Sequence, residues 1–267
     1  MKTANSPLTK LQETSEWSDY CVLVPHYNHV TELKSFLPKL ERLNLACIVV
    51  DDGSESKTKL ELKSLISPLQ GFHLIEHAEN RGKGAAIETG SRHARQLAFT
   101  HMLQIDADGQ HDLADVPKFL RYSRAHPKQI VSGAPSFDAS APKARVYGRK
   151  VTDFWVALET LSLGVKDSLC GFRVYPLAEF ERVYQKHSIG ARMEFDTDVL
   201  VKSIWQGIQI HFIPTKVIYL ENSVSHFHYL RDNLRLIYLH VGLMIGMLIR
   251  LPKLLYWRLI GRQATSN

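Results

Sequence analysis

The residues best suited to chemistry are two aspartates separated by one residue, Asp106 and Asp108, with Gln110 two positions further on. A hard divalent cation such as Mg²⁺ or Mn²⁺ takes one or two carboxylates, waters and phosphate oxygens, and an amide oxygen can join them. The spacing predicts that these three residues hold such an ion, which would neutralise a diphosphate as it leaves. The competing interpretation is structural, because two aspartates in a turn also form Asx-turns and helix caps.

A second acidic cluster, Asp51-Asp52-Gly53-Ser54, allows two interpretations. It can be simple turn chemistry, in which Ser54 caps the helix that follows. It can also be a binding site, in which Asp52 hydrogen-bonds a nucleoside base or ribose. Packing the carboxylates of both clusters into one cleft raises their energy unless a cation or a ligand compensates them.

The segment Asn80-Arg81-Gly82-Lys83-Gly84 carries two cations directly before a predicted helix. Flexible glycines and free amides at a helix N-terminus favour a phosphate-bearing ligand, which Lys83 would contact. The segment lacks the spacing of a Walker A loop, which argues against a P-loop ATPase or kinase.

Alternating short apolar runs and amphipathic stretches predict the elements that position these residues. Strands are expected at 20–25, 46–51, 72–77, 102–106 and 129–133, with helices between them at 30–43, 56–66, 84–98 and 113–124. This alternation is typical of an α/β fold with a mostly parallel, Rossmann-like sheet flanked by helices. Ligands of such sheets bind beyond the carboxyl ends of the strands. Both acidic clusters and the loop Pro25-His26-Tyr27-Asn28 fall there, so we expect three loops to form one site.

After Gly133 the pattern loosens through a loop rich in Pro, Ala and Ser, and then predicts a helix at 146–163 and a loop and strand at 167–175. We divide the chain into a loose leader (1–19), one catalytic domain (20–225) and a C-terminal basic and apolar helical segment (226–267).

The composition fits a folded protein of a reducing compartment. With 45% hydrophobic and 22% charged residues, the 267-residue chain can bury a full core. Its three cysteines, Cys21, Cys47 and Cys170, lack the spacing of a disulfide framework or a structural zinc site. The first 20 residues hold no continuous apolar run, so we expect no signal peptide and a catalytic part that stays in the cytoplasm.

The formal charge of +6 and the pI near 9.1 favour anionic partners. Nucleic acid is disfavoured, because the carboxylates at the strand ends would repel a phosphate backbone. Part of the positive charge follows an apolar run of 14 residues at 236–249, in the basic cluster of Arg250, Lys253, Arg258 and Arg262.

That apolar run is shorter than the roughly 20 residues that cross a bilayer. We therefore expect an amphipathic helix that lies on a membrane as a peripheral anchor, with Tyr256 and Trp257 at headgroup level and the basic cluster against anionic lipid. The alternatives are a solvated tail, a buried core helix and a homodimer interface.

Six ordered motifs resemble the family 2 glycosyltransferases with the GT-A fold, among them the polyprenyl- and dolichyl-phosphate sugar synthases and bacterial envelope-lipid enzymes. The resemblance extends over about residues 21–222. The motifs are VPHYN at 24–28, VDDGS at 50–54, NRGKG at 80–84, DADGQH at 106–111, DSLCGFR at 167–173 and EFDTD at 194–198.

The resemblance implies a nucleotide-sugar donor (a UDP- or GDP-sugar), Mg²⁺ or Mn²⁺, and a polyprenyl phosphate or other lipid-linked acceptor. It places the donor phosphates and the metal at the Asp106, Asp108 and Gln110 set, and a basic residue near a substrate phosphate at Arg149. The remaining implied substrate-binding residues are Pro25, Tyr27, Asn28, Asp52 and Lys83 on the donor side and Gly171, Phe172 and Arg173 on the acceptor side.

Enzymes of this family resemble one another in inverting the anomeric carbon by one in-line displacement. A hydroxyl acceptor then needs a general base, whereas a phosphate acceptor does not. Asp196 is the first candidate, with Asp198 and Asp167 as alternatives, although acids near a helix start also interact favourably with its dipole. A role of His226 at the metal stays open, and we interpret His228 as structural.

We therefore predict an inverting, metal-dependent hexosyltransferase at the cytoplasmic face of the cell membrane. The alternative from another class is a catalytically silent, membrane-associated subunit that keeps the nucleotide pocket. A sugar-1-phosphate nucleotidyltransferase is disfavoured, because no glycine-rich G-x-G-T-R-type loop stands near the first predicted strand.

Overall fold

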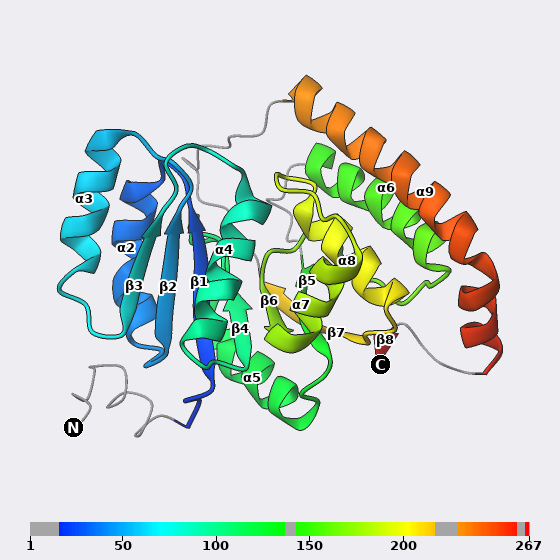
Figure 1. Cartoon of the computed structure of the whole chain (residues 1–267), viewed down its shortest axis with the longest axis horizontal. Helices are drawn as coiled ribbons and strands as arrows, with labels where there is room; N and C mark the ends of the chain where they lie inside the picture. The colour runs from blue at the N-terminus through cyan, green and yellow to red at the C-terminus, as the bar shows by residue number, and fades with distance from the viewer. Residues whose placement is uncertain (1–15, 137–142, 217–228, 261–264, 267) are drawn as a thin grey trace.

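Eight strands form one sheet in the order β3-β2-β1-β4-β6-β5-β7-β8 in the computed structural model, which describes residues 16–136, 143–216, 229–260 and 265–266 (Figure 1). The strands are β1 (Tyr20–His26), β2 (Ala46–Asp51), β3 (Phe72–Glu76), β4 (His101–Gln104), β5 (Ile130–Ser136), β6 (Arg173–Pro176), β7 (Ile210–Lys216) and β8 (Thr265–Ser266).

Only β6 departs from the parallel arrangement within the described sheet, because it runs antiparallel to both β4 and β5. β1, β2 and β4 are parallel neighbours, so their carboxyl ends open at one edge of the sheet. β1 and β2 are buried almost throughout, as expected of parallel strands that helices cover on both faces.

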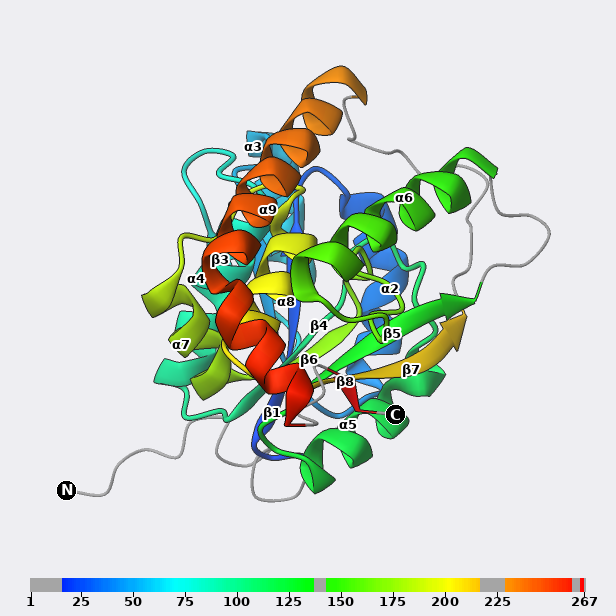
Figure 2. The same cartoon turned by 90° about the vertical axis from the view of Figure 1, so that its right-hand side faces the viewer.

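The helices form two layers on the sheet. One core cluster joins one face of the sheet to α2 (Val30–Glu41), α3 (Ser56–Ile66) and α5 (Val116–Ala125). The other cluster joins the opposite face to α4 (Lys83–Gln96), α7 (Leu177–Lys186) and α8 (Phe195–Trp205). Two longer helices, α6 (Lys143–Thr160) and α9 (Tyr229–Leu259), complete this second layer from outside and lie side by side (Figures 1 and 2).

The predicted α/β architecture is confirmed, with element ends shifted by a few residues. The helix expected at 113–124 begins as a 3₁₀ turn, Leu113–Asp115, whose Asp112 side chain accepts a hydrogen bond from the Ala114 amide. All three cysteines are buried and free. The expected leader up to residue 15, the boundary at residue 225, and His226 and His228 lie outside the described residues.

The last helix is longer than the sequence suggested. α9 has 31 residues, and its part Leu234–Leu259 is long and apolar enough to cross a membrane by length and composition. The argument that the apolar stretch is too short to span was therefore wrong, because the helix continues through the charges at Arg235 and Arg250. Its buried side chains Leu243, Met247 and Leu254 belong to the protein core.

Candidate active site

Three loops end at the carboxyl edge of the sheet, and hydrogen bonds join the first two of them. The loop after β1 contacts the loop after β2, because the Asn28 amide donates to the Ser54 hydroxyl at 2.8 Å and the Asn28 side chain accepts from the Glu55 amide at 3.1 Å. His26 and Asp51, neighbours in the β1–β2 register, bond at 2.9 Å. The predicted convergence of these loops is present, and Pro25 and Tyr27 lie half-buried at the same edge.

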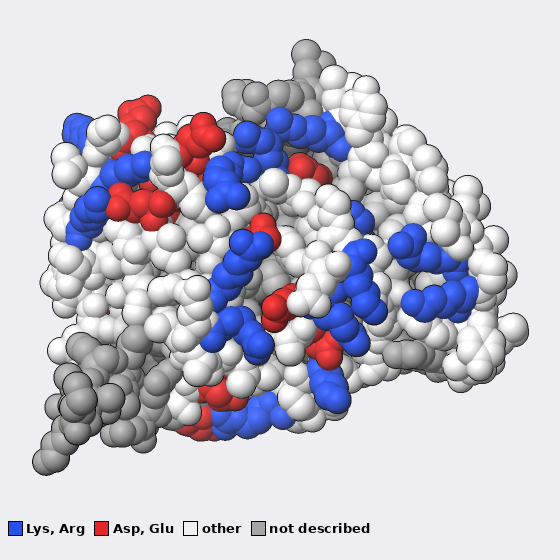
Figure 3. Space-filling view, viewed as in Figure 1, with Lys and Arg blue, Asp and Glu red and all other residues white. Residues whose placement is uncertain are grey.

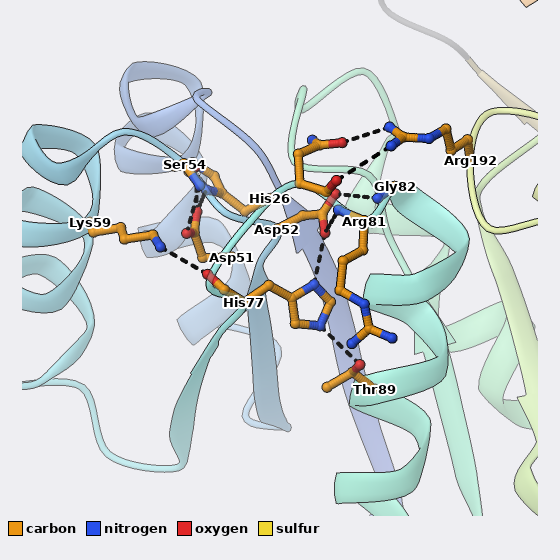
Figure 4. Close-up of polar contacts among 11 residues, drawn as sticks. His26, Asp51, Asp52, Ser54, Lys59, His77, Arg81, Gly82, Thr89 and Arg192 are labelled. Atoms are coloured by element: carbon orange, nitrogen blue, oxygen red, sulfur yellow. Dashed lines mark hydrogen bonds and ion pairs between the residues drawn. The ribbon is translucent and has the colours of Figure 1, made fainter.

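Asp52 has a structural role that the sequence did not predict. Its buried carboxylate accepts hydrogen bonds from the backbone amides of Arg81 and Gly82, at 2.9 and 2.7 Å, and contacts Nδ1 of His77 at 2.7 Å (Figure 4). Nε2 of His77 lies 2.9 Å from the Thr89 hydroxyl. Asp52 therefore anchors the loop that carries Lys83, and its expected nucleoside contact stays a prediction.

Lys83 reaches the centre of the site. Its Nζ lies 2.7 and 2.9 Å from the two oxygens of Asp106, at the end of β4, and 2.7 Å from Oδ2 of Asp196, in the first turn of α8. Burial alone would lower the pKa of Lys83, but the two carboxylates outweigh it and raise that pKa. The predicted ligand-binding lysine therefore lies bonded to two carboxylates.

The Asp106 and Asp108 carboxylates have opposite pKa shifts. Burial opposes ionisation of Asp106, yet Lys83 outweighs it and lowers the pKa. Burial and then the charge of Asp106 raise the pKa of Asp108. One oxygen of Asp108 accepts a hydrogen bond from the Gln110 amide at 3.0 Å.

This pair fits a divalent cation. The only printed partner of the Asp106 Oδ1 atom among the described residues is Lys83, in an ion pair at 2.7 Å, and burial and the Asp106 charge together disfavour the Asp108 carboxylate. A bound cation would relieve the repulsion between the two carboxylates. No three histidine, cysteine, aspartate or glutamate side chains in the described part of the chain converge to hold an ion. The protein would thus supply two carboxylates, and the side-chain oxygen of Gln110, two residues after Asp108, is a third candidate ligand. The remaining coordination positions would go to water and phosphate oxygens, as Mg²⁺ prefers.

The antiparallel strand β6 brings the loop before it against Asp106. A Cβ built on Gly171 would lie 2.2 Å from Oδ2 of Asp106, so glycine is required at this close approach. The next two side chains point into the protein. Phe172 is buried and stacks on His111, with ring centroids 5.1 Å apart.

Arg173 is fully buried and donates hydrogen bonds to protein groups from all three guanidinium nitrogens. The acceptors include the backbone oxygens of Ser168 and Asp196, each at 2.7 Å. The expectation that Phe172 and Arg173 line an acceptor site is therefore corrected. Arg173 instead ties the loop before β6 to the start of α8.

Asp196 and Asp198 are also held by the protein. Asp196 accepts hydrogen bonds from Lys83 and, at 3.1 Å, from the Gln104 side chain. Asp198 accepts from the Gly190 amide at 2.7 Å and pairs with Lys202 along α8. Occupied oxygens favour a positioning role for Asp196 over proton abstraction.

A second polar cluster lies where α6 meets the loop before β6. Arg149 pairs with Asp167, whose other oxygen accepts from the Leu169 amide at 2.8 Å. Asp153, one turn after Arg149, is half-buried beside Asp167. Burial and the Asp167 charge raise the pKa of Asp153 to about 7.

The family described as Glycosyl transferase family 2 matches the chain over residues 21–180, more than half of its length. The chain belongs to glycosyl transferase family 2. This glycosyltransferase is similar to two curated relatives. It is 26% identical over 220 residues to UDP-N-acetylglucosamine–dolichyl-phosphate N-acetylglucosaminyltransferase of Methanococcus voltae, covering 76% of this chain and 87% of that protein. It is 28% identical over 200 residues to dolichyl-phosphate beta-glucosyltransferase of Dictyostelium discoideum, covering 67% and 60%.

The fold of the glycosyltransferase is the GT-A fold. A solved structure, the mannosyltransferase PcManGT from Pyrobaculum calidifontis in complex with GDP-Man and Mn²⁺, aligns with a TM-score of 0.56 at 19% identity. The alignment covers 91% of this chain and 72% of that one.

Two polar residues of the glycosyltransferase site, Gln104 and Asp153, were not predicted from the sequence. Gln104 stands two positions before Asp106 at the end of an apolar strand, and this period-2 spacing places both on one side of the chain. Asp153 follows Arg149 by four residues, the helical spacing that brings side chains together. Each signal was available, but neither distinguishes a site residue from an ordinary surface residue.

Proposed function

We propose that this glycosyltransferase moves a sugar from a UDP- or GDP-sugar to a polyprenyl phosphate or other lipid-linked acceptor, with inversion and with Mg²⁺ or Mn²⁺. The observation that carries the proposal is the Asp106 and Asp108 pair, half-buried beside Lys83 at the carboxyl edge of the sheet. The printed names of the relatives support a dolichyl-phosphate type of acceptor, and the PcManGT complex supports a nucleotide-sugar with Mn²⁺.

In this proposal Asp106, Asp108 and Gln110 hold the metal ion. When bound, the ion supplies positive charge that neutralises the departing nucleoside diphosphate. The half-buried loop of Pro25, Tyr27 and Asn28 faces the nucleoside, and Lys83 faces the donor phosphates.

The acceptor side lies at the Arg149 cluster, next to the loop that holds Gly171 against Asp106. The acceptor oxygen forms its bond to the anomeric carbon while the bond from that carbon to the diphosphate oxygen breaks, and the diphosphate leaves with the electron pair. A phosphate acceptor is already ionised and needs no base, whereas a hydroxyl would need one. Arg149 has the charge to orient a phosphate acceptor.

We also propose that α6 and α9 rest on the cytoplasmic face of a membrane. Large apolar side chains are exposed along both helices, which lie side by side. We call this surface the apolar platform, and it consists of Val151, Phe154, Trp155, Val241, Ile245, Leu248 and Ile249. In Figure 3 the right-hand part of the molecule, over α9, is white with blue Lys and Arg groups. Apolar surface beside basic groups fits anionic lipid. A second copy of the chain is the alternative cover for this platform.

The test is a calorimetric titration with UDP, GDP and their sugar conjugates, with and without Mn²⁺, followed by an assay of donor turnover. We expect metal-dependent binding of one nucleotide and its loss in Asp108→Asn. The matched control is Asp112→Asn, four residues further on, whose side chain caps the 3₁₀ turn instead. Binding without any turnover of donor would favour the catalytically silent subunit, and the absence of nucleotide binding would refute the proposal.

A further inference from the structure

We propose that Lys83 is an internal counter-cation that occupies Asp106 until a nucleotide arrives, so that metal and nucleotide bind cooperatively. This inference rests on the proposed function of the site. It concerns the order in which Asp106 exchanges partners, and it assigns Asp196 the role of holding Lys83 during that exchange.

The backbone that carries Lys83 is fixed in place. Asp52 binds the amides of Arg81 and Gly82, and Arg192 donates a hydrogen bond to the Asn80 side chain at 2.8 Å (Figure 4). These contacts reach the loop from β2 on one side and from the segment before α8 on the other. The lysine therefore starts from a defined position.

Two glycines show that this loop is also tightly packed. A Cβ on Gly82, which has φ +105°, would lie 2.4 Å from the backbone oxygen of Ala191. A Cβ on Gly84 would lie 2.5 Å from the backbone oxygen of Gly190. Because the backbone on both sides of Lys83 is in contact with the 190–191 segment, any exchange of partners must come from rotation of the lysine side chain.

The ammonium group lies where it competes with a metal ion. Nζ is within 2.9 Å of both oxygens of Asp106, the carboxylate that a divalent ion would share with Asp108. A cation at Asp106 would be repelled by the ammonium group at short range in this half-buried site. The metal therefore binds weakly while Lys83 stays in this position.

A nucleoside diphosphate removes this obstacle, because its phosphate oxygens offer Lys83 a new anionic partner. The bond to Asp196, at 2.7 Å, lets Lys83 leave Asp106 without losing all its carboxylate contacts. The Asp196 carboxylate itself accepts a hydrogen bond from the Gln104 side chain at 3.1 Å, which keeps it in place while Lys83 changes partner. Each ligand then improves the site for the other, and linkage requires the two effects on affinity to be equal.

The experiment measures Mn²⁺ affinity by calorimetry, alone and with the nucleotide that the protein binds. Lys83→Met removes the charge and keeps the apolar stem. We expect Lys83→Met to bind Mn²⁺ alone at least about fivefold more tightly than the wild type, and to lose most of the nucleotide-dependent gain in affinity. A rise in melting temperature on adding Mn²⁺ alone, larger in the variant, is a second readout.

Two variants serve as controls. Lys83→Arg keeps the positive charge and should bind Mn²⁺ alone as weakly as the wild type. Lys202→Met removes the lysine that pairs with Asp198 on α8, outside the metal site, and should leave Mn²⁺ affinity unchanged. If Lys83→Met binds Mn²⁺ alone no more tightly than the wild type, the counter-cation role is refuted.

The wild-type protein provides a test that does not depend on folding of the variant. If nucleotide leaves the Mn²⁺ affinity of the wild type unchanged, the inference is overturned although nucleotide binding and the proposed function stand. Failure of the proposed function has a different signature, which is no nucleotide binding with or without metal.

Discussion

Some residues of the recognisable motifs support the site through contacts with protein groups, while others face it. Asp52 and Arg173 each belong to a motif that suggests ligand binding, yet each is buried and bonded to protein groups. A buried charged group must find partners, because an unpaired one is costly. Here the partners are backbone groups of neighbouring loops, so both residues determine where those loops lie.

Asp153 gives a prediction for the dependence of stability on pH. Its pKa is raised from 3.8 to about 7, first by burial and then by the Asp167 charge. Between about pH 4 and pH 7 the folded protein binds more protons at this site than the unfolded chain, so the free energy of unfolding falls as pH rises.

Asp153→Asn removes the titrating carboxyl, so the free energy of unfolding no longer falls at this site as pH rises. Because solvent screens this half-exposed group, we expect a gain of only about 1–2 kcal/mol at pH 8 and no gain at pH 4. Urea denaturation of both proteins across this pH range measures it. If the free energies of unfolding of the variant and the wild type differed equally at pH 4 and pH 8, the Asp153 carboxyl would not titrate with this raised pKa.

At the scale of elements, one antiparallel strand determines how the site closes. β6 lies between β4 and β5 and delivers the 167–172 loop against the carboxyl end of β4. Gly171 then lies against Asp106 and Phe172 enters the core. The geometry of the proposed metal site therefore depends on this loop as well as on the Asp-x-Asp motif.

Gly171→Ala tests this dependence. The added methyl group would lie 2.2 Å from an Asp106 oxygen, so the carboxylate or the loop must move. We expect at least a tenfold loss of Mn²⁺-dependent nucleotide binding, about 1.4 kcal/mol, measured by calorimetry.

The matched control is Gly148→Ala on α6, where a Cβ has no neighbour within 4 Å. That change should leave binding intact and stabilise the helix by about 0.5–1 kcal/mol. Normal binding in Gly171→Ala would show that the loop has room to retreat.

At the scale of the whole molecule, α9 is docked on the protein by polar as well as apolar contacts. Its His240 bonds the fully buried Glu159 of α6 at 2.7 Å, and Lys253 donates to the backbone oxygen of Trp205 at 3.0 Å. Burial raises the pKa of Glu159, and the bond to His240 opposes that rise. These contacts favour a helix that lies along the protein, so its exposed side is the surface available to a membrane.

Leu248→Glu tests the membrane proposal. Leu248 is 58% exposed on α9, and we expect the charge to weaken binding to anionic phospholipid vesicles roughly tenfold, because it removes apolar contact and repels anionic lipid. The control is the same change at Leu60, 70% exposed on α3, which should leave sedimentation with vesicles unchanged. Equal effects of both changes, or a loss of dimer in place of vesicle binding, would contradict a membrane role for this platform.

The sequence by itself determined the α/β fold, the three loops at the carboxyl edge, and the Asp106 and Asp108 pair. Those features depend on local periodicity and on the fact that parallel strands end at one edge. Only the tertiary structure decided that Lys83 binds Asp106 and Asp196, that Asp52 and Arg173 serve the scaffold, and that α9 docks on α6 and α8. These outcomes depend on contacts between residues far apart in the chain, and a residue's type does not tell which of several available partners it will meet.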